Sequence, residues 1–194
     1  MGTPRVLILG HSFICRLHDF IERNSRHLDL KFQLQASAHL WWHGSWGRTI
    51  AKTVKFDLHI IHSFRPDIVI VQLGTNDLTS CPPLQVGSAP KEDLVHLPHD
   101  SYGVKVIYVC QTIRRRSAVL FSQRVDILTH YLRVALEPIP YAIYWGHRGF
   151  WRSRHSFLSS NGVHLNSKGQ CKLYRSLRGA VLKSLWAFTN DSNQ

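Results

Sequence analysis

The sequence predicts a three-layer α/β/α sandwich around a parallel sheet of about five strands. Short runs rich in β-branched residues alternate along the chain with longer stretches of helical periodicity. Several of the short runs are almost continuously apolar, which is typical of strands buried on both faces. No internal repeat interrupts the alternation, so a solenoid is not expected.

Two runs are typical of buried strands. Arg5–Gly10 reads RVLILG and is the first expected strand, and Asp67–Leu73, which reads DIVIVQL, is the clearest one in the chain. Further strands are expected at Leu30–Gln35, where apolar and polar residues alternate, and at Val104–Cys110 and Pro140–Trp145.

The segments between the strands carry apolar residues at helical spacing. Helices are therefore expected at Phe13–Asn24, Thr49–Phe64, Ser117–Leu136 and Ser167–Phe188. The segment Ser80–Ser101 contains four prolines, and it is expected to be mostly loop with one short helix at most.

The length of 194 residues suits a single domain over residues 1–194. No apolar run approaches the ~20 residues of a membrane span, and the N-terminal apolar run is too short for a signal-peptide core. We therefore expect an intracellular protein, cytoplasmic or nuclear. The four cysteines are scattered and the histidines are dispersed, so free thiols are expected, and neither a metal nor another cofactor.

The positive charge of the chain is concentrated in its second half. Residues 1–100 carry 10 basic and 9 acidic side chains, whereas residues 101–194 carry 14 and 3. This surplus favours a polyanionic partner, either nucleic acid or an anionic lipid surface; the alternative is a solvated basic face without a partner. Arginines near a strand end or interleaved with aromatic residues are the candidate contacts. They are Arg114, Arg115, Arg116, Arg148, Arg152 and Arg154.

Ligands of open parallel sheets bind beyond the carboxyl ends of the strands. The turns after Leu9, Gln35 and Leu73 are expected to meet at that edge. A serine in the first turn, Ser12, has the position of a nucleophile at a helix N-terminus. The same position is also a common one for a helix N-cap, and Ser12 alone would favour the cap.

Two other segments add candidate residues to this edge. The turn Gly74-Thr75-Asn76-Asp77 offers the Asn76 amide as a donor to an oxyanion, with an Asx turn as the alternative. The segment before the last helix contains His164. It is either a general base that reaches the edge or an ordinary surface histidine in a chain that has 13 histidines.

The three motifs in this order resemble the signature blocks of the SGNH (GDSL-type) hydrolases. That family has G-D-S, G-x-N-D and D-x-x-H, and this chain has GHS, GTND and NGVH. The resemblance runs from Val6 to the last helix and implies a flavodoxin-like SGNH fold. It implies Ser12 as nucleophile, His164 as base, and an oxyanion hole formed by Ser12 N–H, Asn76 and a glycine after the second strand. Gly47 of Gly47-Arg48-Thr49 resembles the family glycine best, and Gly44 is the alternative. More loosely, the pattern is similar to SGNH-type esterase domains of some animal retrotransposons.

The chain departs from the family pattern at two positions. His11 replaces the Asp of G-D-S, which affects the turn more than the chemistry. Asn161 stands three residues before His164, where the family has its triad carboxylate. An asparagine can orient a histidine, but it cannot stabilise an imidazolium as a carboxylate does.

These features together predict a serine esterase that acts on small acyl or acetyl esters, with turnover reduced by Asn161. The alternative is a weakly active or inactive module of the same fold whose basic half binds nucleic acid or an anionic surface. Three tryptophans, Trp41, Trp42 and Trp46, precede the oxyanion glycine and are expected to border an apolar substrate pocket, with core packing as the alternative for at least one of them.

Overall fold

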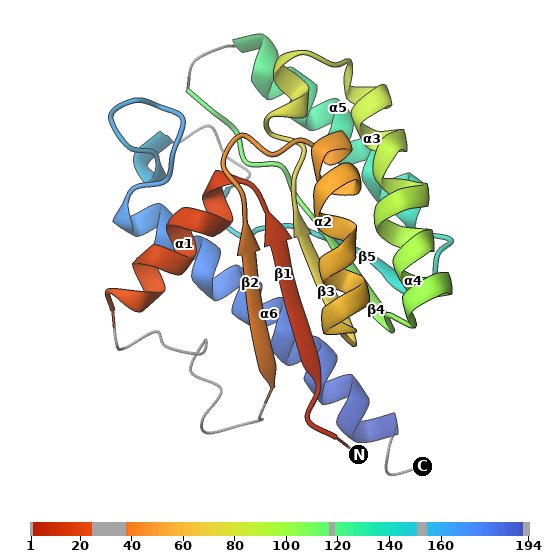
Figure 1. Ribbon diagram of the computed structural model, residues 1–194. Coiled ribbons are helices and arrows are strands. Elements are labelled where there is room, and N and C mark those ends of the chain that lie inside the picture. The colour runs from red at the N-terminus through yellow and green to blue at the C-terminus, as the bar shows by residue number, and fades with distance from the viewer. Residues whose placement is uncertain (1, 25–37, 117–118, 151–154, 192–194) are drawn as a thin grey trace.

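The sheet predicted from the sequence is present and has five parallel strands in the order β2-β1-β3-β4-β5. We describe residues 2–24, 38–116, 119–150 and 155–191 in a computed structural model of the chain (Figure 1). The strands are β1 (Arg5–Gly10), β2 (His39–Gly44), β3 (Ile68–Gln72), β4 (Val106–Cys110) and β5 (Ala142–Trp145).

Helices follow the strands. They are α1 (Ser12–Glu22), α2 (Ile50–Phe64), α3 (Pro83–Pro90), α4 (Leu97–Tyr102), α5 (Val119–Leu136) and α6 (Ser167–Asp191). Three short helical segments complete the set: the 3₁₀ turns η2 (Asp77–Thr79) and η4 (His155–Phe157) and the π-helical η3 (Lys91–His96).

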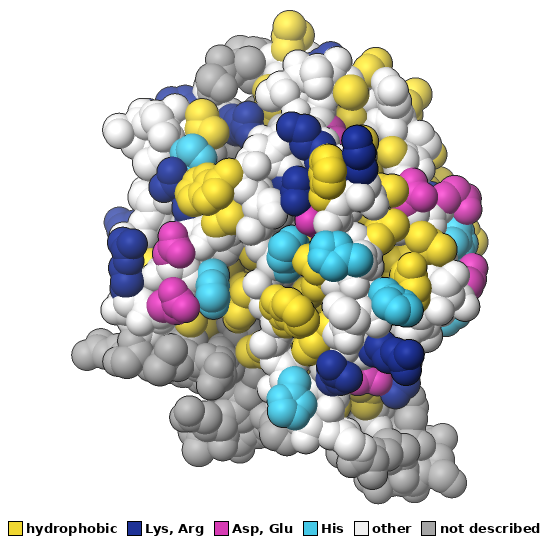
Figure 2. Space-filling model, viewed as in Figure 1, with side chains coloured by type: hydrophobic (Ala, Val, Ile, Leu, Met, Phe, Trp, Pro, Cys, Tyr) yellow, Lys and Arg dark blue, Asp and Glu magenta, His cyan; other side chains and the backbone are white. Residues whose placement is uncertain are grey.

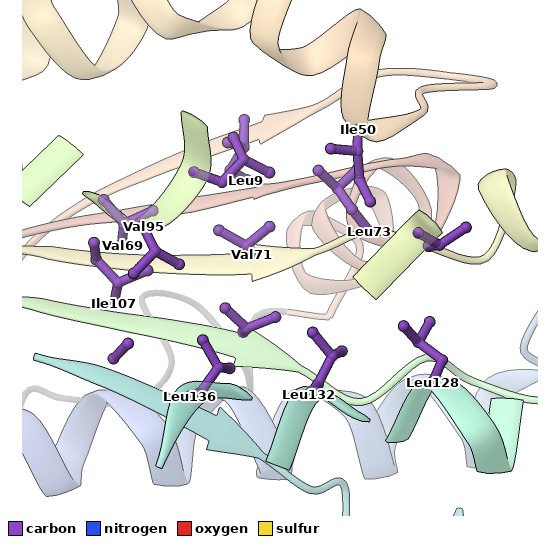
Figure 3. Packing of buried hydrophobic residues seen from close by; sticks show 14 of the residues in the cluster. Leu9, Ile50, Val69, Val71, Leu73, Val95, Ile107, Leu128, Leu132 and Leu136 are labelled. Atoms are coloured by element: carbon purple, nitrogen blue, oxygen red, sulfur yellow. The ribbon is translucent and has the colours of Figure 1, made fainter. Parts of the chain in front are cut away.

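The helices cover both faces of the sheet. One core contains residues of α1 and α6 together with Val6 and Ile8 of β1, whereas the other contains residues of α2, α3 and α5 together with Leu7 and Leu9. Figure 3 shows the second core, in which side chains of β1, β3 and β4 face those of α2 and α5. Successive β1 residues point to opposite faces, and both faces are buried, which explains why the run is apolar throughout.

The second strand differs from the expectation. Leu30–Gln35 lies outside the described residues, and the strand beside β1 is β2, His39–Gly44. This edge strand carries two histidines and two tryptophans and therefore lacks the apolar run of a central strand.

The prediction of a loop at Ser80–Ser101 was wrong. Three helical segments, α3, η3 and α4, occupy most of it. The prolines explain the error, because Pro83 and Pro98 lie in the first turns of α3 and α4. A proline is tolerated there, since the first N–H groups of a helix have no partner within the helix.

None of the helices in the described ranges is long and apolar enough to cross a membrane. The four cysteines are all free thiols.

Candidate active site at the carboxyl edge of the sheet

The carboxyl ends of the first three strands lie level with one another. Gly10 at the end of β1 pairs with Gly44 of β2 on one side and with Gln72 of β3 on the other. The chain leaves these strands toward the top of Figure 1, where the turns that hold Ser12, Gly47 and Asn76 begin. The register of the sheet thus brings three distant pieces of sequence to one edge.

Ser12 is the first residue of α1, and the cap of that helix is its neighbour. The ring of His11 accepts a hydrogen bond from Phe13 N–H, with 3.4 Å between Nδ1 and N. Because His11 has the capping role, the Ser12 hydroxyl is not needed for it. Ser12 is 8% exposed, so the residue is largely buried at the start of the helix.

The His11 side chain is completely buried beside Ser12. Burial lowers its pKa to about 3, and the positive charges of Arg115 and His164 act in the same direction. Its Nε2 atom has no hydrogen-bond partner among the described residues. His11 is therefore a neutral ring at neutral pH.

An ion pair holds the turn that follows β2. The Arg48 guanidinium binds the buried Asp57 carboxylate through two hydrogen bonds of 2.8 and 2.7 Å, and His43 Nε2 lies 3.2 Å from the same carboxylate. The neighbouring Gly47 has a φ of +63°, a left-handed conformation in which glycine is favoured. The residue that follows Gly47 is thus tied to α2 by a charge-assisted ion pair.

Asn76 is fixed by contacts on both ends of its amide. Arg115 Nη2 donates to Asn76 Oδ1 at 2.8 Å, and Asn76 Nδ2 donates to the carbonyl of Arg48, also at 2.8 Å. Arginine has no acceptor, so the atom facing it must be the oxygen. One hydrogen on Nδ2 therefore remains available after the bond to Arg48, as an oxyanion donor requires.

The next residue, Asp77, ties the same turn to α2. Its Oδ1 atom accepts from Ile50 N–H at 2.9 Å, at the start of that helix. Burial raises the pKa of the Asp77 carboxyl, and the hydrogen bond from Ile50 opposes the rise. The GTND segment thus connects Asn76 to the Gly47 turn through two adjacent side chains.

The turn that holds His164 is closed by the Asn161 side chain. Asn161 Oδ1 accepts from Val163 N–H at 2.9 Å and from His164 N–H at 3.2 Å, and Ser159 Oγ donates to it at 2.7 Å. Asn161 Nδ2 lies 3.2 Å from His164 Nδ1. The pair predicted from the spacing is therefore in contact.

The contacts of Asn161 determine which nitrogen of His164 carries the proton. Backbone N–H groups can only donate, so the amide oxygen must face them and the amide nitrogen must face the ring. An N–H donor at Nδ1 favours the tautomer of His164 with its proton on Nε2. That tautomer cannot accept a proton at Nε2, which is the atom used by the histidine of a serine hydrolase.

The surroundings of His164 contain two arginines. Its ring meets the edge of the Phe13 ring with centroids 6.5 Å apart, which places it next to the start of α1. Partial burial lowers the pKa of His164, and the charges of Arg16 and Arg115 lower it further. No hydrogen bond joins Ser12 to His164 among the described residues.

Solved structures with the same fold support this description of the architecture. A lipase/acylhydrolase from Enterococcus faecalis superposes with a TM-score of 0.72 over 94% of this chain and 97% of its own, at 14% sequence identity. An acetyl esterase mutant bound to an acetate ion gives 0.71 over 96% and 100%, at 12% identity. A GDSL-like lipase from Bacteroides thetaiotaomicron gives 0.69 over 95% and 93%, at 13% identity. This chain has the SGNH hydrolase fold. The sequence itself matches no protein-family model and none of the curated proteins.

The arginines predicted to contact a polyanion differ in their partners and in their exposure to solvent. Arg114 forms an ion pair with Asp126, and Arg115 binds Asn76, whereas Arg116 is exposed. Arg148 is exposed too, and it lines a groove beside β5. Arg152 and Arg154 lie outside the described residues, as does Trp151, while Phe150 is fully buried in the core.

The three tryptophans also differ from one another. Trp41 packs edge-on against Phe64, and Trp42 stacks on His18. Trp46 is 61% exposed and lines a surface groove of about 450 Å³ that also contains Leu165 and Asn166, next to His164. Only Trp46 therefore borders a hollow near the candidate site.

Two contributors were not foreseen as parts of the site, Arg16 and the Arg48–Asp57 ion pair. The spacing of Arg16, one helical turn after Ser12, is visible in the sequence. The Arg48–Asp57 pair joins the start of α2 to its interior and has no motif that would mark it. In the described part of the chain, no group of His, Cys, Asp and Glu is arranged to hold a metal ion.

Proposed function

We propose that this chain is a serine hydrolase of small carboxylic esters. The observation that carries the proposal is the convergence of Ser12, Asn76 and His164 at one sheet edge, on the fold of proteins named as acylhydrolases and esterases. The hydroxyl of Ser12 is free of the capping role, and Asn76 retains an amide hydrogen for an oxyanion.

The proposed reaction has two halves. Ser12 Oγ attacks the acyl carbon, its proton passes to His164, and the ester C–O bond breaks so that the alcohol leaves with that proton. Water then attacks the acyl-enzyme, and the acid leaves as Ser12 regains its proton. Backbone N–H groups of Ser12 and Gly47, with the Asn76 amide, stabilise the oxyanion in both halves.

In this proposal Asn161 orients His164 and sets its tautomer. His164 must move its proton to Nδ1 before Nε2 can act as a base, and two N–H donors would then face each other across 3.2 Å. In a serine protease, the corresponding change from Asp to Asn lowers turnover by ~10⁴-fold because it selects the wrong tautomer. We therefore expect slow but measurable turnover.

The test uses a short-chain nitrophenyl ester and a serine-directed fluorophosphonate probe. Wild type should hydrolyse the ester and take up the probe, and Ser12→Ala should lose both activities. Ser63→Ala is the matched control, because Ser63 is an exposed serine of α2 that bonds only the carbonyl of Ile60. Wild-type turnover no faster than that of Ser12→Ala would refute the hydrolase.

A second candidate function is supported by the groove along the edge strand β5. It has a volume of about 1010 Å³ and is lined by four cationic side chains, with Glu137 as its one acidic lining residue in the described chain. The cations are Arg133, Arg148, Arg175 and Lys183. Tyr144 and Trp145 line it too, and cations beside aromatic rings suit a single nucleic-acid strand.

Fluorescence anisotropy with a labelled oligouridine at several salt concentrations tests this second function. Arg175→Glu and Lys183→Glu should weaken binding, and the dependence on salt should become less steep because fewer phosphates are contacted. Lys91→Glu, on η3, is the control with the same charge change. Equal losses in all three variants would show a general charge effect and would refute the groove as the binding site.

A further inference from the structure

Arg16 projects from the same face of α1 as Ser12. The two residues are four positions apart, which is about one helical turn. The Arg16 guanidinium lies over the Trp46 ring, 5.1 Å from its centroid, and both residues line the groove beside His164. A cation is thus placed one turn from the proposed nucleophile, with an aromatic ring against its guanidinium group.

Arg115 reaches the site from the loop that follows β4. Its Nη2 atom binds Asn76, and its Nε atom is buried without a hydrogen-bond partner among the described residues. The next residue, Arg116, donates its backbone N–H to the carbonyl of Gly162 at 2.8 Å. The loop that carries Arg115 is therefore attached to the turn that carries His164.

These two arginines lack the acidic partners that other arginines of the chain have. Arg48 binds Asp57 and Arg114 binds Asp126, but no carboxylate of a described residue lies within ion-pair distance of Arg16 or Arg115. The groove contains a carboxylate of its own, Asp19, which makes no ion pair with Arg16. The side of the site between the two arginines consequently carries a net positive charge.

Other cations lie near this edge. Figure 2 shows several Lys and Arg side chains over the upper part of the molecule, which is the end at which the strands finish in Figure 1, and further ones at its left and lower right. A neutral ester would gain nothing from cations on two sides of the base, and the cations make imidazolium formation at His164 harder. A negative group of the ligand between them would be stabilised by both charges and would offset this effect on His164.

We propose that the site takes esters bearing an anionic group, a carboxylate or a phosphate, close to the scissile bond, and that Arg16 and Arg115 bind this group. This inference rests on the hydrolase function proposed above. Guanidinium groups bind such oxyanions through paired hydrogen bonds, and the exposed Arg16 has donors to offer, while Arg115 adds positive charge beside Asn76. Asn76, already bound to Arg115, would place the ester carbonyl beside the anionic group.

The test compares 3-acetoxybenzoate with its neutral methyl ester, methyl 3-acetoxybenzoate. Each kcat/KM is divided by the rate of spontaneous hydrolysis, which removes the difference in leaving group. Wild type should favour the anionic substrate by about five- to tenfold, and the preference should fall as salt is raised. Arg16→Gln and Arg115→Gln should each reduce the ratio, whereas Lys91→Gln should leave it unchanged.

A binding arm separates failure of this inference from failure of the hydrolase. Trp46 fluorescence, assigned by difference from Trp46→Phe, is titrated with 3-hydroxybenzoate and with its methyl ester, using Ser12→Ala protein. If both esters are hydrolysed equally and both ligands bind equally, the proposed preference for anionic substrates is wrong, whereas the proposed hydrolase function is supported. Absence of hydrolysis with selective binding of 3-hydroxybenzoate, lost in Arg16→Gln, would remove the hydrolase and support the anion site. Absence of both would overturn the two proposals together.

Discussion

Two backbone N–H groups hold the Asn161 side chain in one orientation, and the effect of that orientation reaches His164. The amide oxygen accepts from Val163 and His164, and the amide nitrogen faces the His164 ring. A carboxylate in the same conformation would keep both backbone bonds and present its second oxygen to Nδ1. An aspartate at position 161 would therefore need no change of backbone geometry to accept a hydrogen bond from Nδ1–H of His164, and it would differ from the asparagine only at the atom that faces the ring.

Replacement of this atom should restore the base. Asn161→Asp is expected to raise kcat/KM for a small ester by about 10²- to 10⁴-fold, because Nδ1–H gains an acceptor and the imidazolium gains a counter-charge. Steady-state kinetics on a nitrophenyl ester measure the change. Asn161→Ala serves as the control and should give no increase. If Asn161→Asp folds normally and its rate stays at the wild-type level, His164 is not the base.

The charges around His164 also predict the pH dependence of catalysis. The base must be neutral, so kcat/KM falls as the pH drops through the pKa of His164. That pKa is lowered from 6.5 by burial, Arg16 and Arg115, so the acidic limb should lie below pH 6.5. Arg16→Gln removes one positive charge and should move the limb to higher pH. A profile of kcat/KM against pH that is identical in both proteins would contradict the assignment.

At the scale of elements, the position of Ser12 depends on how closely β2 approaches α1. A Cβ atom on Gly44 would lie 2.5 Å from the backbone nitrogen of Cys15 and 2.8 Å from its sulfur. The last residue of the strand therefore touches the first turn of the helix. No side chain larger than hydrogen fits between them.

Gly44→Ala should consequently push α1 away from the sheet. We expect a loss of about 1–3 kcal/mol in the free energy of unfolding, together with a lower kcat because Ser12 is displaced from Asn76. Urea denaturation and ester kinetics measure the two effects. Gly2→Ala is the matched control, since a Cβ atom there meets nothing within 4 Å. Full activity in Gly44→Ala would show that Ser12 does not depend on this contact.

The elements were predicted well where burial alone determines the residue pattern. β1 and β3 are buried on both faces, so their apolar runs identify them. β2 was missed because an edge strand has polar and aromatic residues in place of such a run. At Ser80–Ser101 the prolines predict a loop because proline interrupts the interior of a helix, but the first turn of a helix accepts proline.

The candidate site was less predictable than the fold. Motif order marked Ser12, Asn76 and His164 as candidates, and the spacing marked Asn161; their catalytic roles stay predictions. The orientation of the Asn161 amide follows from backbone geometry, which a sequence pattern does not contain. The Asn76–Arg115 contact joins residues 39 positions apart, and nothing local marks it.

At the scale of the whole molecule, two buried histidines link stability to pH. His11 and His147 are both fully buried, and burial lowers the pKa of each to about 3. His147 forms hydrogen bonds with Gln72 and Ser176 through its two ring nitrogens, so its neutral form is built into the core between β3 and α6. In the folded protein, both rings therefore stay neutral until the pH is strongly acidic.

The unfolded chain protonates these rings near pH 6.5, so between pH 6.5 and 3 it binds more protons than the folded chain. Their stabilising contribution is complete above pH 6.5 and is lost as the pH falls. Each ring should contribute a slope of about 1.4 kcal/mol per pH unit to the free energy of unfolding once the pH is well below 6.5. Urea denaturation at several pH values between 7 and 4 measures this slope.

His11→Asn separates the two contributions, because asparagine can cap α1 but does not titrate in this range. The variant should lose about 1.4 kcal/mol per pH unit of the wild-type slope. An unchanged slope would mean that His11 is protonated equally in both states.

The turn that contains Asn161 also bears on how this position can change in evolution. Codons for asparagine and aspartate differ by one base, and the backbone donors that hold Asn161 would hold an aspartate in the same way. A single nucleotide substitution would thus place an aspartate here and complete the Ser-His-Asp arrangement of the proposed hydrolase. Because the same backbone hydrogen bonds would hold either residue, the proposed activity would change at this position without a change of fold.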